Sequence, residues 1–246
     1  MQQTLLLSAI LLFAMTRVLA GEIRVAVASN FTGPAREIAR RFETKSADRV
    51  ILIFGSTGRH YAQIRHGAPF DLFFAADSER PRRLEQQGLA LPGSRFTYAL
   101  GRLVLWSPRA GLVDARGEVL AQGDFHFLAL ANPRFAPYGK AAEQVLRRRG
   151  LWEGLQGRLV RGENIGQTFH FVTSGNAELG FVAYSQIHTP DGTIGGSWWK
   201  VPQSLYDPIE QQAVLLKEGE APRAFLDYAG SDEARAIIRG FGYATP

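Results

Sequence analysis

Hydroxyl, amide and glycine residues gather in four loops of the chain, and together these loops could hold an anion. Each follows a short apolar run and precedes a helical pattern: Ser29-Asn30, Ser56-Thr57-Gly58, Pro137-Tyr138-Gly139 and Asn164-Ile165-Gly166. The first N–H groups of a helix lack backbone partners and carry a partial positive charge, so they bind anions without a charged side chain. A single loop of this kind is more simply a helix cap. Four in corresponding positions favour a shared anion site.

Catalytic and metal chemistry has less support in the residue types. The chain has five histidines, His60, His66, His126, His170 and His188. None of them shows the His-x-x-x-His or His-Glu-x-x-His spacing of a zinc site, and no Gly-x-Ser-x-Gly or Gly-x-x-x-x-Gly-Lys motif occurs. A secreted hydrolase that uses Ser56 or Ser29 remains an alternative, although the sequence places no base beside either. Asp71 and Asp77 are expected to bound a buried strand.

The composition is that of a globular protein and excludes further kinds of functional site. The 246 residues are 46% hydrophobic and 21% charged, and none is cysteine. The chain therefore cannot be a disulfide scaffold, a thiolate zinc site, an iron–sulfur protein or a cysteine enzyme. The formal net charge is +5, and arginine runs such as Arg147-Arg148-Arg149 fit exposed helix faces. Without interleaved aromatic residues they do not indicate nucleic-acid binding.

The N-terminus has the pattern of a secretion signal. Leu5 to Met15 is an apolar run, shorter than the roughly 20 residues that span a bilayer. Val18-Leu19-Ala20 then offers a cleavage site before Gly21. We predict a signal peptide over residues 1–20, cleaved after about Ala20. An exported chain without cysteine indicates the bacterial periplasm.

The rest of the chain alternates strand and helix patterns twice, which predicts an α/β fold with two lobes. Strands are expected at residues 23–28, 50–54, 70–76, 125–131, 159–160 and 179–183, each leading toward a helix or a loop. Two longer runs, 98–106 and 211–217, are expected to cross between the lobes, and residues 222–241 to return as helices to the first lobe. The predicted division is 21–99 with 214–246 for lobe 1 and 100–213 for lobe 2.

Several stretches of the sequence resemble those of one protein family. They are Ala28-Ser29-Asn30, Gly55-Ser56-Thr57-Gly58, the run from Gly67 to Asp77 (GAPFDLFFAAD), Leu103 to Ser107, Asn132 to Gly139 and Leu179 to Ala183. Their combination is similar to the periplasmic molybdate-binding proteins of ATP-binding-cassette transporters, over essentially the whole chain after residue 20. The resemblance implies a type II periplasmic binding-protein fold, with mixed sheets flanked by helices and two crossing hinge strands. It also implies a monomer without cofactor or catalysis, which delivers molybdate or tungstate to a membrane permease.

The resemblance also implies a set of ligand-binding residues. In lobe 1 these are Ser29, Asn30 and Thr57, with Ser56 adjacent, and Thr57 stands where the family usually has serine. In lobe 2 they are Tyr138 and the N–H of Ile165. Ala183 occupies a position where many members have a ligating tyrosine, and the neighbouring Tyr184 should face the other way on a strand. Tyr138 is therefore the candidate source of a phenol.

The mechanism that follows is reversible capture of an oxyanion by neutral donors, with closure of the two lobes around it. Affinity should then change little across neutral pH. The same fold could instead bind another tetrahedral oxyanion, sulfate or phosphate, or a small organic anion.

Overall fold

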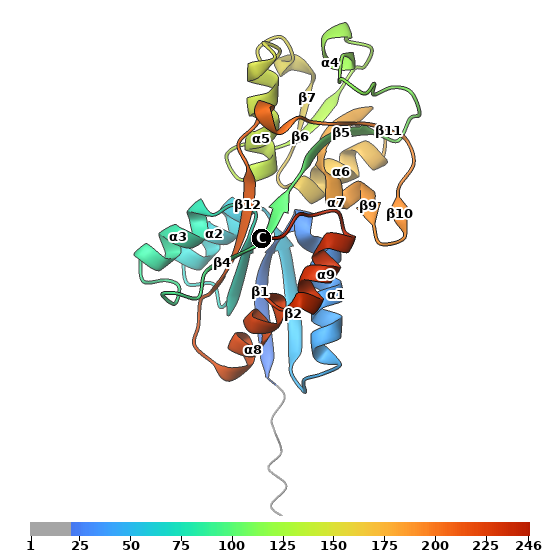
Figure 1. Ribbon diagram of the computed structural model, residues 1–246. Coiled ribbons are helices and arrows are strands. Elements are labelled where there is room, and N and C mark those ends of the chain that lie inside the picture. Colours follow the sequence, from blue (N-terminus) through green and yellow to red (C-terminus); the bar gives the residue numbers. More distant parts are fainter. Residues whose placement is uncertain (1–20) are drawn as a thin grey trace, which may run out of the picture.

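Two five-stranded sheets organise the two lobes of the protein, as the computed structural model shows for residues 21–246 (Figure 1). The predicted signal peptide, residues 1–20, lies outside the described residues. Both sheets are mixed and both carry helices, so the predicted α/β two-lobe class is confirmed. Among the described residues no helix is long and apolar enough to cross a membrane.

The first lobe is the lower one in Figure 1. Its sheet has the order β2 (Arg49–Gly55), β1 (Glu22–Ala28), β3 (Leu72–Ala75), β12 (Ile209–Leu215) and β4 (Phe96–Gly101). Its helices are α1 (Thr32–Glu43), α2 (Thr57–Arg65), α3 (Glu79–Gln86), α8 (Glu220–Ala229) and α9 (Asp232–Gly240). β1 is parallel to β2 and β3, whereas β12 runs antiparallel to β3 and β4.

Both faces of this sheet are covered, which explains why its strands are apolar without alternation. Val25 and Val27 of β1 pack in the cluster that contains residues of α1, α8 and α9. Ala26, between them, faces the opposite way and packs with Ile64 of α2 and Leu84 of α3. Successive side chains of a strand point to opposite faces, so a continuous apolar run can bury both.

The second lobe repeats this layering. Its sheet has the order β11 (Ser197–Lys200), β5 (Leu103–Ser107), β8 (Leu179–Ala183), β6 (Leu128–Ala131) and β7 (Leu159–Gly162). Its helices are α4 (Val119–Gln122), α5 (Pro137–Arg148), α6 (Ile165–Thr173) and α7 (Tyr184–Ile187). Leu128 and Leu130 of β6 pack in the cluster of α5, whereas Ala129 between them packs with Val172 of α6.

The chain passes between the lobes twice. β4 belongs to the first sheet and β5 to the second, with Arg102 between them, so the predicted single run 98–106 is two strands. The return passes from β11 to β12, which pairs with the first sheet along its length. At the first crossing a side chain on Gly101 would overlap the Tyr138 hydroxyl, so only glycine fits there. The exact residues that divide the lobes stay a prediction.

Short elements complete the fold, and the sequence did not predict them. They are the 3₁₀ turns η1 (Ser29–Phe31), η2 (Gln156–Arg158) and η3 (Gln203–Leu205) and the two-residue strands β9 (His188–Thr189) and β10 (Gly192–Thr193). Ser78 occupies the N-cap position of α3 but forms no capping hydrogen bond; Asp77 Oδ1 accepts the Arg80 N–H instead, at 2.9 Å. Asp71 Oδ2 likewise accepts the Arg24 N–H at 2.7 Å, so both aspartates bound the strand, as predicted.

Candidate anion-binding site

All six predicted ligand residues line one small cavity between the lobes. Ser29, Asn30, Ser56 and Thr57 come from the first lobe, and Tyr138 and Ile165 from the second. The cavity has a volume of about 10 Å³, so the two lobes leave only a small space between these residues. In the part of the chain that the structure describes, the lining contains hydroxyl, amide and apolar groups and no charged side chain. Any charge that binds here must be held by neutral donors.

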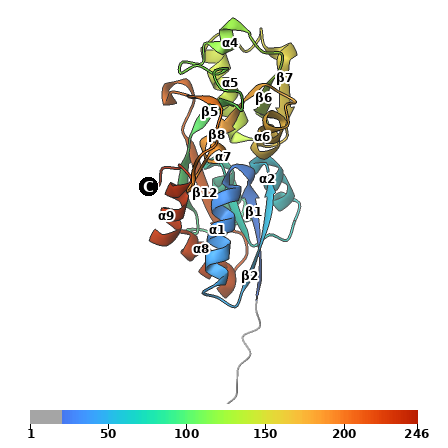
Figure 2. The ribbon, with the colours of Figure 1, turned by 90° about the vertical axis from the view of Figure 1, so that its right-hand side faces the viewer.

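Four helical elements begin at this cavity. η1 starts at Ser29, α2 at Thr57, α5 at Pro137 and α6 at Ile165. Each follows the carboxyl end of a strand, where open α/β sheets place their ligands. In Figure 2, α6 of the second lobe lies directly above α2 of the first. The unpaired N–H groups and positive ends of these helices therefore point toward one place, which suits an anion.

Ser56 carries the clearest sign of a missing partner. Its side chain is 2% exposed, and its hydroxyl has no hydrogen-bond partner among the described residues. It occupies the N-cap position of α2, where a serine normally accepts a backbone N–H, but it forms no cap. An unsatisfied buried hydroxyl costs about 1–3 kcal/mol, so its retention beside the cavity points to a ligand that accepts its proton.

The hydroxyl groups of Thr57 and Ser29 also have a proton to donate. Thr57 Oγ1 accepts the N–H of Ala76 at 3.0 Å, and Ser29 Oγ accepts the N–H of Gly166 at 3.1 Å. Each hydroxyl acts only as an acceptor in these bonds. The Ser29 bond joins the two lobes, because Gly166 belongs to α6. Both hydroxyl groups can therefore donate to an anion while they keep their structural bonds.

The side chains of Asn30 and Tyr138 point into a polar network behind the cavity. Asn30 Nδ2 donates to Gln211 Oε1 at 2.7 Å and to the Tyr243 hydroxyl at 3.0 Å. The Tyr138 hydroxyl accepts from Gln211 Nε2 at 3.2 Å. Tyr138 lines the cavity, and the expectation that it offers a phenol to the anion stays a prediction. The backbone N–H groups of Asn30 and Tyr138, in the first turns of η1 and α5, are also available to a ligand.

This network is uncharged. Burial raises the pKa of the Tyr98 and Tyr138 hydroxyl groups well above the usual value, and burial raises the pKa of Tyr243 to about 12. The single O–H of Tyr98 is shared between Ala75 O at 3.0 Å and Gln211 Oε1 at 3.1 Å. All three phenols therefore stay neutral at any pH at which the protein works, and none repels an anion by its charge.

At α6 the surrounding bonds leave the Ile165 N–H for a ligand. Asn164 caps the helix by accepting the Gln167 N–H at 2.9 Å, and the Gly166 N–H donates to Ser29. Ile165 N–H, at the first helical position, has no partner within the helix. Tyr184, expected on a strand, is instead the first residue of α7; it stacks on His188 with ring centroids 4.9 Å apart and is not among the lining residues.

The geometry does not support a serine nucleophile. His60 is the histidine nearest in sequence to Ser56, but its Nδ1 lies 3.1 Å from Gln63 Oε1 and its Nε2 3.2 Å from Val27 O. Both ring nitrogens thus have other partners. Burial lowers the pKa of His60, although its two hydrogen bonds oppose that effect. Within residues 21–246 no group of three or more histidine and acidic side chains could hold a metal ion.

Contacts between the lobes close the cavity at its rim. The Gly58 N–H donates to Phe135 O at 2.8 Å, and Arg59 pairs with Glu163 at 2.5 Å. The loops could be predicted from the sequence, but these contacts could not. Gln211 and Tyr243 were not predicted either, although two adjacent glutamines inside an apolar strand are the sequence feature that could have indicated Gln211.

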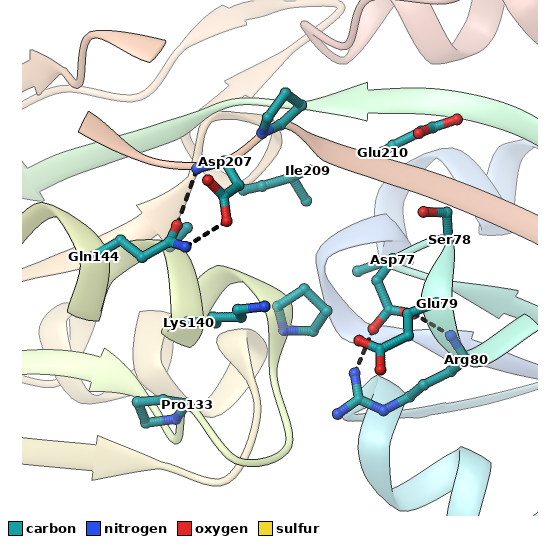
Figure 3. Close-up of a pocket in the computed structure, with 14 residues that line it drawn as sticks. Asp77, Ser78, Glu79, Arg80, Pro133, Lys140, Gln144, Asp207, Ile209 and Glu210 are labelled. Atoms are coloured by element: carbon teal, nitrogen blue, oxygen red, sulfur yellow. Dashed lines mark hydrogen bonds and ion pairs between the residues drawn. The ribbon is translucent and has the colours of Figure 1, made fainter. Parts of the chain in front are cut away.

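A wider groove of about 370 Å³ lies beside the cavity and shares Ala76 and Pro137 with it (Figure 3). Its charged lining consists of Asp77, Glu79, Asp207 and Glu210 with Arg80 and Lys140. Acidic groups outnumber basic ones, and Arg80 is already paired with Asp77. Electrostatics therefore favours the small neutral cavity over this groove as a site for an anion.

The fold and the cavity together define a class: a two-lobed protein that encloses a small anion between its lobes. The family model of bacterial extracellular solute-binding proteins matches residues 23–244. The chain belongs to this family.

Individual relatives of the chain within this family share a more specific description. The chain is 49% identical to the molybdate-binding protein ModA of Azotobacter vinelandii over 227 residues, 91% of this chain and 90% of that protein. It is 49% identical to ModA of Rhodobacter capsulatus over 229 residues, 92% and 89% of the two chains. The solved structure of the Azotobacter vinelandii periplasmic molybdate-binding protein superimposes with a TM-score of 0.88 at 44% identity, covering 91% and 99%. All three are named as molybdate-binding proteins.

Proposed function

We propose that this protein captures molybdate or tungstate outside the cytoplasm and delivers it to an ATP-binding-cassette permease. The observation that carries the proposal is the convergence of donors from both lobes on one uncharged cavity, with the Ser56 hydroxyl left without a partner. Relatives that share about half of the residues are molybdate-binding proteins. A compact tetrahedral anion can place its central atom in so small a space while its oxygens meet the surrounding donors.

The proposed ligand contacts are the hydroxyl groups of Ser29, Ser56 and Thr57 and the backbone N–H groups of Asn30, Tyr138 and Ile165. Fixed neutral donors and helix ends replace the water around the dianion, which would otherwise be costly to bury. Contacts from both lobes favour the closed state, because an anion that touches both lobes binds that state more tightly. The permease would then recognise the closed form.

The protein would act in the periplasm after removal of residues 1–20, and as a monomer. The supports for this location are the apolar N-terminal run and the extracellular solute-binding family to which the chain belongs. Mass spectrometry of the protein purified from periplasmic extract tests the cleavage after Ala20, and the native mass tests the monomer and shows whether an oxyanion is retained.

Isothermal titration of the mature chain with molybdate, tungstate, sulfate and phosphate tests the ligand. We expect tight, one-to-one binding of molybdate and tungstate and much weaker binding of the other two. Selectivity over sulfate rests on cavity size, because both kinds of dianion are tetrahedral. Tight binding of sulfate or phosphate alone would assign the same fold to another oxyanion. Ester hydrolysis lost on Ser56→Ala would instead support the hydrolase alternative.

A further inference from the structure

Gln211 lies where the two lobes meet and contacts the ligand loops of both. Its side chain is fully buried on the crossing strand β12. The amide oxygen accepts from Asn30 Nδ2 at 2.7 Å, and Asn30 belongs to η1 of the first lobe. The amide nitrogen donates to the Tyr138 hydroxyl at 3.2 Å, and Tyr138 belongs to α5 of the second lobe. One side chain thus joins the two halves of the cavity wall.

The backbone around Gln211 is shaped for these contacts. The pairing of β12 with β4 shifts register between Gln211 and Gln212, so that Gln211 faces Ala99, Gln212 faces Thr97, and Tyr98 is the extra residue of a bulge. A bulge redirects side chains near a site. Here the Tyr98 hydroxyl reaches the Gln211 oxygen at 3.1 Å. The amide is therefore held in one orientation by Tyr98 and Asn30, and its N–H side faces the second lobe.

A second bridge holds Asn30 from the other side. The Tyr243 hydroxyl donates to Asn30 O at 2.7 Å, and Ser185 Oγ of α7 donates to Tyr243 at 2.8 Å. Ser185 Oγ also lies 3.0 Å from Asn30 O. Opening of the lobes must break the contacts of Ser185 and of Tyr138 with this network. Asn30 thus keeps its bonds to Gln211 and Tyr243 of the first lobe, and it gains the Ser185 contact only when the second lobe is in place.

We propose that Gln211 is a positioning residue that couples closure of the lobes to capture of the anion, a role that rests on the proposed function. It does not touch the ligand. It holds Asn30 and Tyr138 in the closed arrangement, where their backbone N–H groups face the cavity. An amide suits this place because it donates to one lobe and accepts from the other without a charge that would repel the dianion.

The first test compares two neighbouring glutamines. Gln211→Met keeps the length of the side chain and removes its hydrogen bonds. We expect the Kd for molybdate to rise about 10- to 100-fold, the effect of losing hydrogen bonds that leave buried partners unsatisfied. The decrease in radius of gyration on adding molybdate, measured by small-angle X-ray scattering, should become smaller.

Gln212→Met is the matched control. Gln212 lies on the same strand and is 7% exposed, but its partners Arg95, Thr97 and Glu210 all belong to the first lobe. This variant should lose thermal stability while its Kd for molybdate stays within about twofold of wild type, because these partners neither line the cavity nor belong to the second lobe. If Gln211→Met and Gln212→Met lose the same amount of affinity, Gln211 has only a structural role and the proposed coupling is wrong.

A second variant gives a readout that a general loss of packing would not produce. Glutamate in Gln211→Glu has the same shape, but its ionised form cannot donate to Tyr138 and places a negative charge near the dianion. The titratable groups around it are the neutral phenols of Tyr98, Tyr138 and Tyr243. We expect its molybdate affinity to rise as pH falls, whereas wild-type and Gln212→Glu affinities stay flat.

The outcomes separate the two proposals. If the wild-type chain binds neither molybdate nor tungstate, both the proposed function and the proposed coupling are wrong. If the wild-type chain binds but both Gln211 variants bind as tightly, with unchanged pH dependence, only the coupling is wrong. If Gln211→Met does not fold, the pH dependence of molybdate affinity in Gln211→Glu still tests the proposed coupling.

Discussion

Ser56 and Ser107 are both buried serines, but their hydroxyl groups have opposite surroundings. Ser56 Oγ has no partner among the described residues, whereas Ser107 Oγ donates to Glu178 O at 2.6 Å, away from the cavity. We expect Ser56→Ala to lower molybdate affinity about 10- to 100-fold, as loss of a hydrogen bond to a charged group does. The free energy of unfolding of the unliganded protein should stay the same or rise, because the variant removes a buried hydroxyl that has no partner among the described residues. Calorimetric titration and urea unfolding measure the two quantities.

Ser107→Ala supplies the comparison for that experiment. It should lower the free energy of unfolding by about 1 kcal/mol and leave the affinity as in wild type. A Ser56→Ala variant that binds as tightly as wild type would mean that its hydroxyl does not reach the ligand.

The neutral lining predicts how affinity depends on pH. Among residues 21–246 no charged side chain lines the cavity, burial keeps the three network phenols neutral, and burial lowers the pKa of His60. The Kd for molybdate should therefore vary by less than about threefold between about pH 6.5 and 9, the range where only histidine, cysteine or the terminal amine usually titrate. Titrations at fixed ionic strength measure it. A step centred near the usual histidine pKa would show that a titrating group contributes to the site.

At the scale of elements, the start of α2 approaches the loop before α5 so closely that only glycine fits. A Cβ on Gly58 would lie 2.9 Å from the Phe135 Cα and 3.0 Å from its carbonyl oxygen. Gly58→Ala should prevent full closure and raise the Kd for molybdate about tenfold or more, since overpacking typically costs about 1–3 kcal/mol. The unliganded protein should keep its stability, because alanine favours the helix and the open lobes separate the two loops.

Gly157→Ala is the control for this prediction. A Cβ on Gly157 in η2 would meet nothing within 4 Å, so affinity and stability should both remain close to wild type. The same affinity loss in both variants would exclude closure as the cause.

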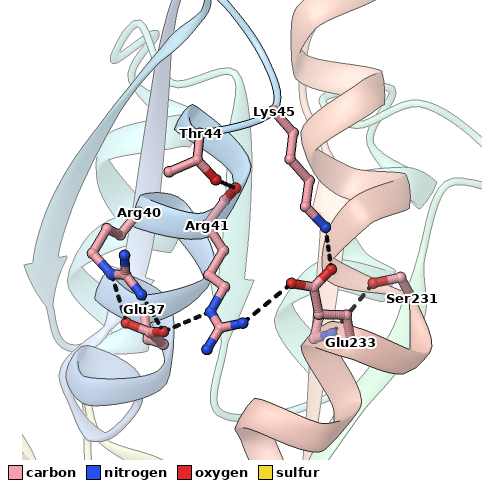
Figure 4. A network of polar contacts seen from close by, with 8 residues as sticks. Glu37, Arg40, Arg41, Thr44, Lys45, Ser231 and Glu233 are labelled. Carbon is pink, nitrogen blue, oxygen red and sulfur yellow. Dashed lines mark hydrogen bonds and ion pairs between the residues drawn. The ribbon is translucent and has the colours of Figure 1, made fainter.

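At the scale of the whole molecule, carboxylates in both lobes predict acid sensitivity. In the first lobe Glu37 accepts hydrogen bonds from Arg40 and Arg41, beside the Arg41–Glu233 pair that joins α1 and α9 (Figure 4). These hydrogen bonds lower the pKa of Glu37 to about 2. In the second lobe burial raises the pKa of Glu178, but the N–H groups of Phe127 and His126 outweigh it and bring it to about 2.

Both groups therefore stabilise the fold fully above the unfolded pKa of 4.5 and lose that contribution as pH falls toward about 2. The free energy of unfolding should decrease across this window, and Glu178→Gln should make the decrease less steep while lowering stability at neutral pH. Urea unfolding at a series of pH values measures this. Glu153→Gln, whose side chain is 82% exposed, should leave the curve unchanged. An unchanged slope in Glu178→Gln would contradict the assignment.

Most of the elements could be predicted from the sequence because their causes are local. The buried strand Leu179–Ala183 is found at its predicted residues, and Pro137 begins α5, where its missing N–H costs nothing. The break at Arg102 was not predicted, because apolar residues lie on both sides of Gly101 and Arg102 and the whole run from Tyr98 to Trp106 has the length of one long strand. Which sheet each half joins depends on partners far away in the chain.

The sequence by itself determined the two-lobe α/β architecture and the four loops that converge on the cavity, since both follow from periodicity, helix starts and strand ends. Only the tertiary structure decided which atoms of those loops remain free for a ligand. Asn30 turns its amide to Gln211, a residue 181 positions later, and Ser56 is left without a partner. Such bonds depend on surfaces brought together by packing of the two lobes, and no local pattern encodes their direction.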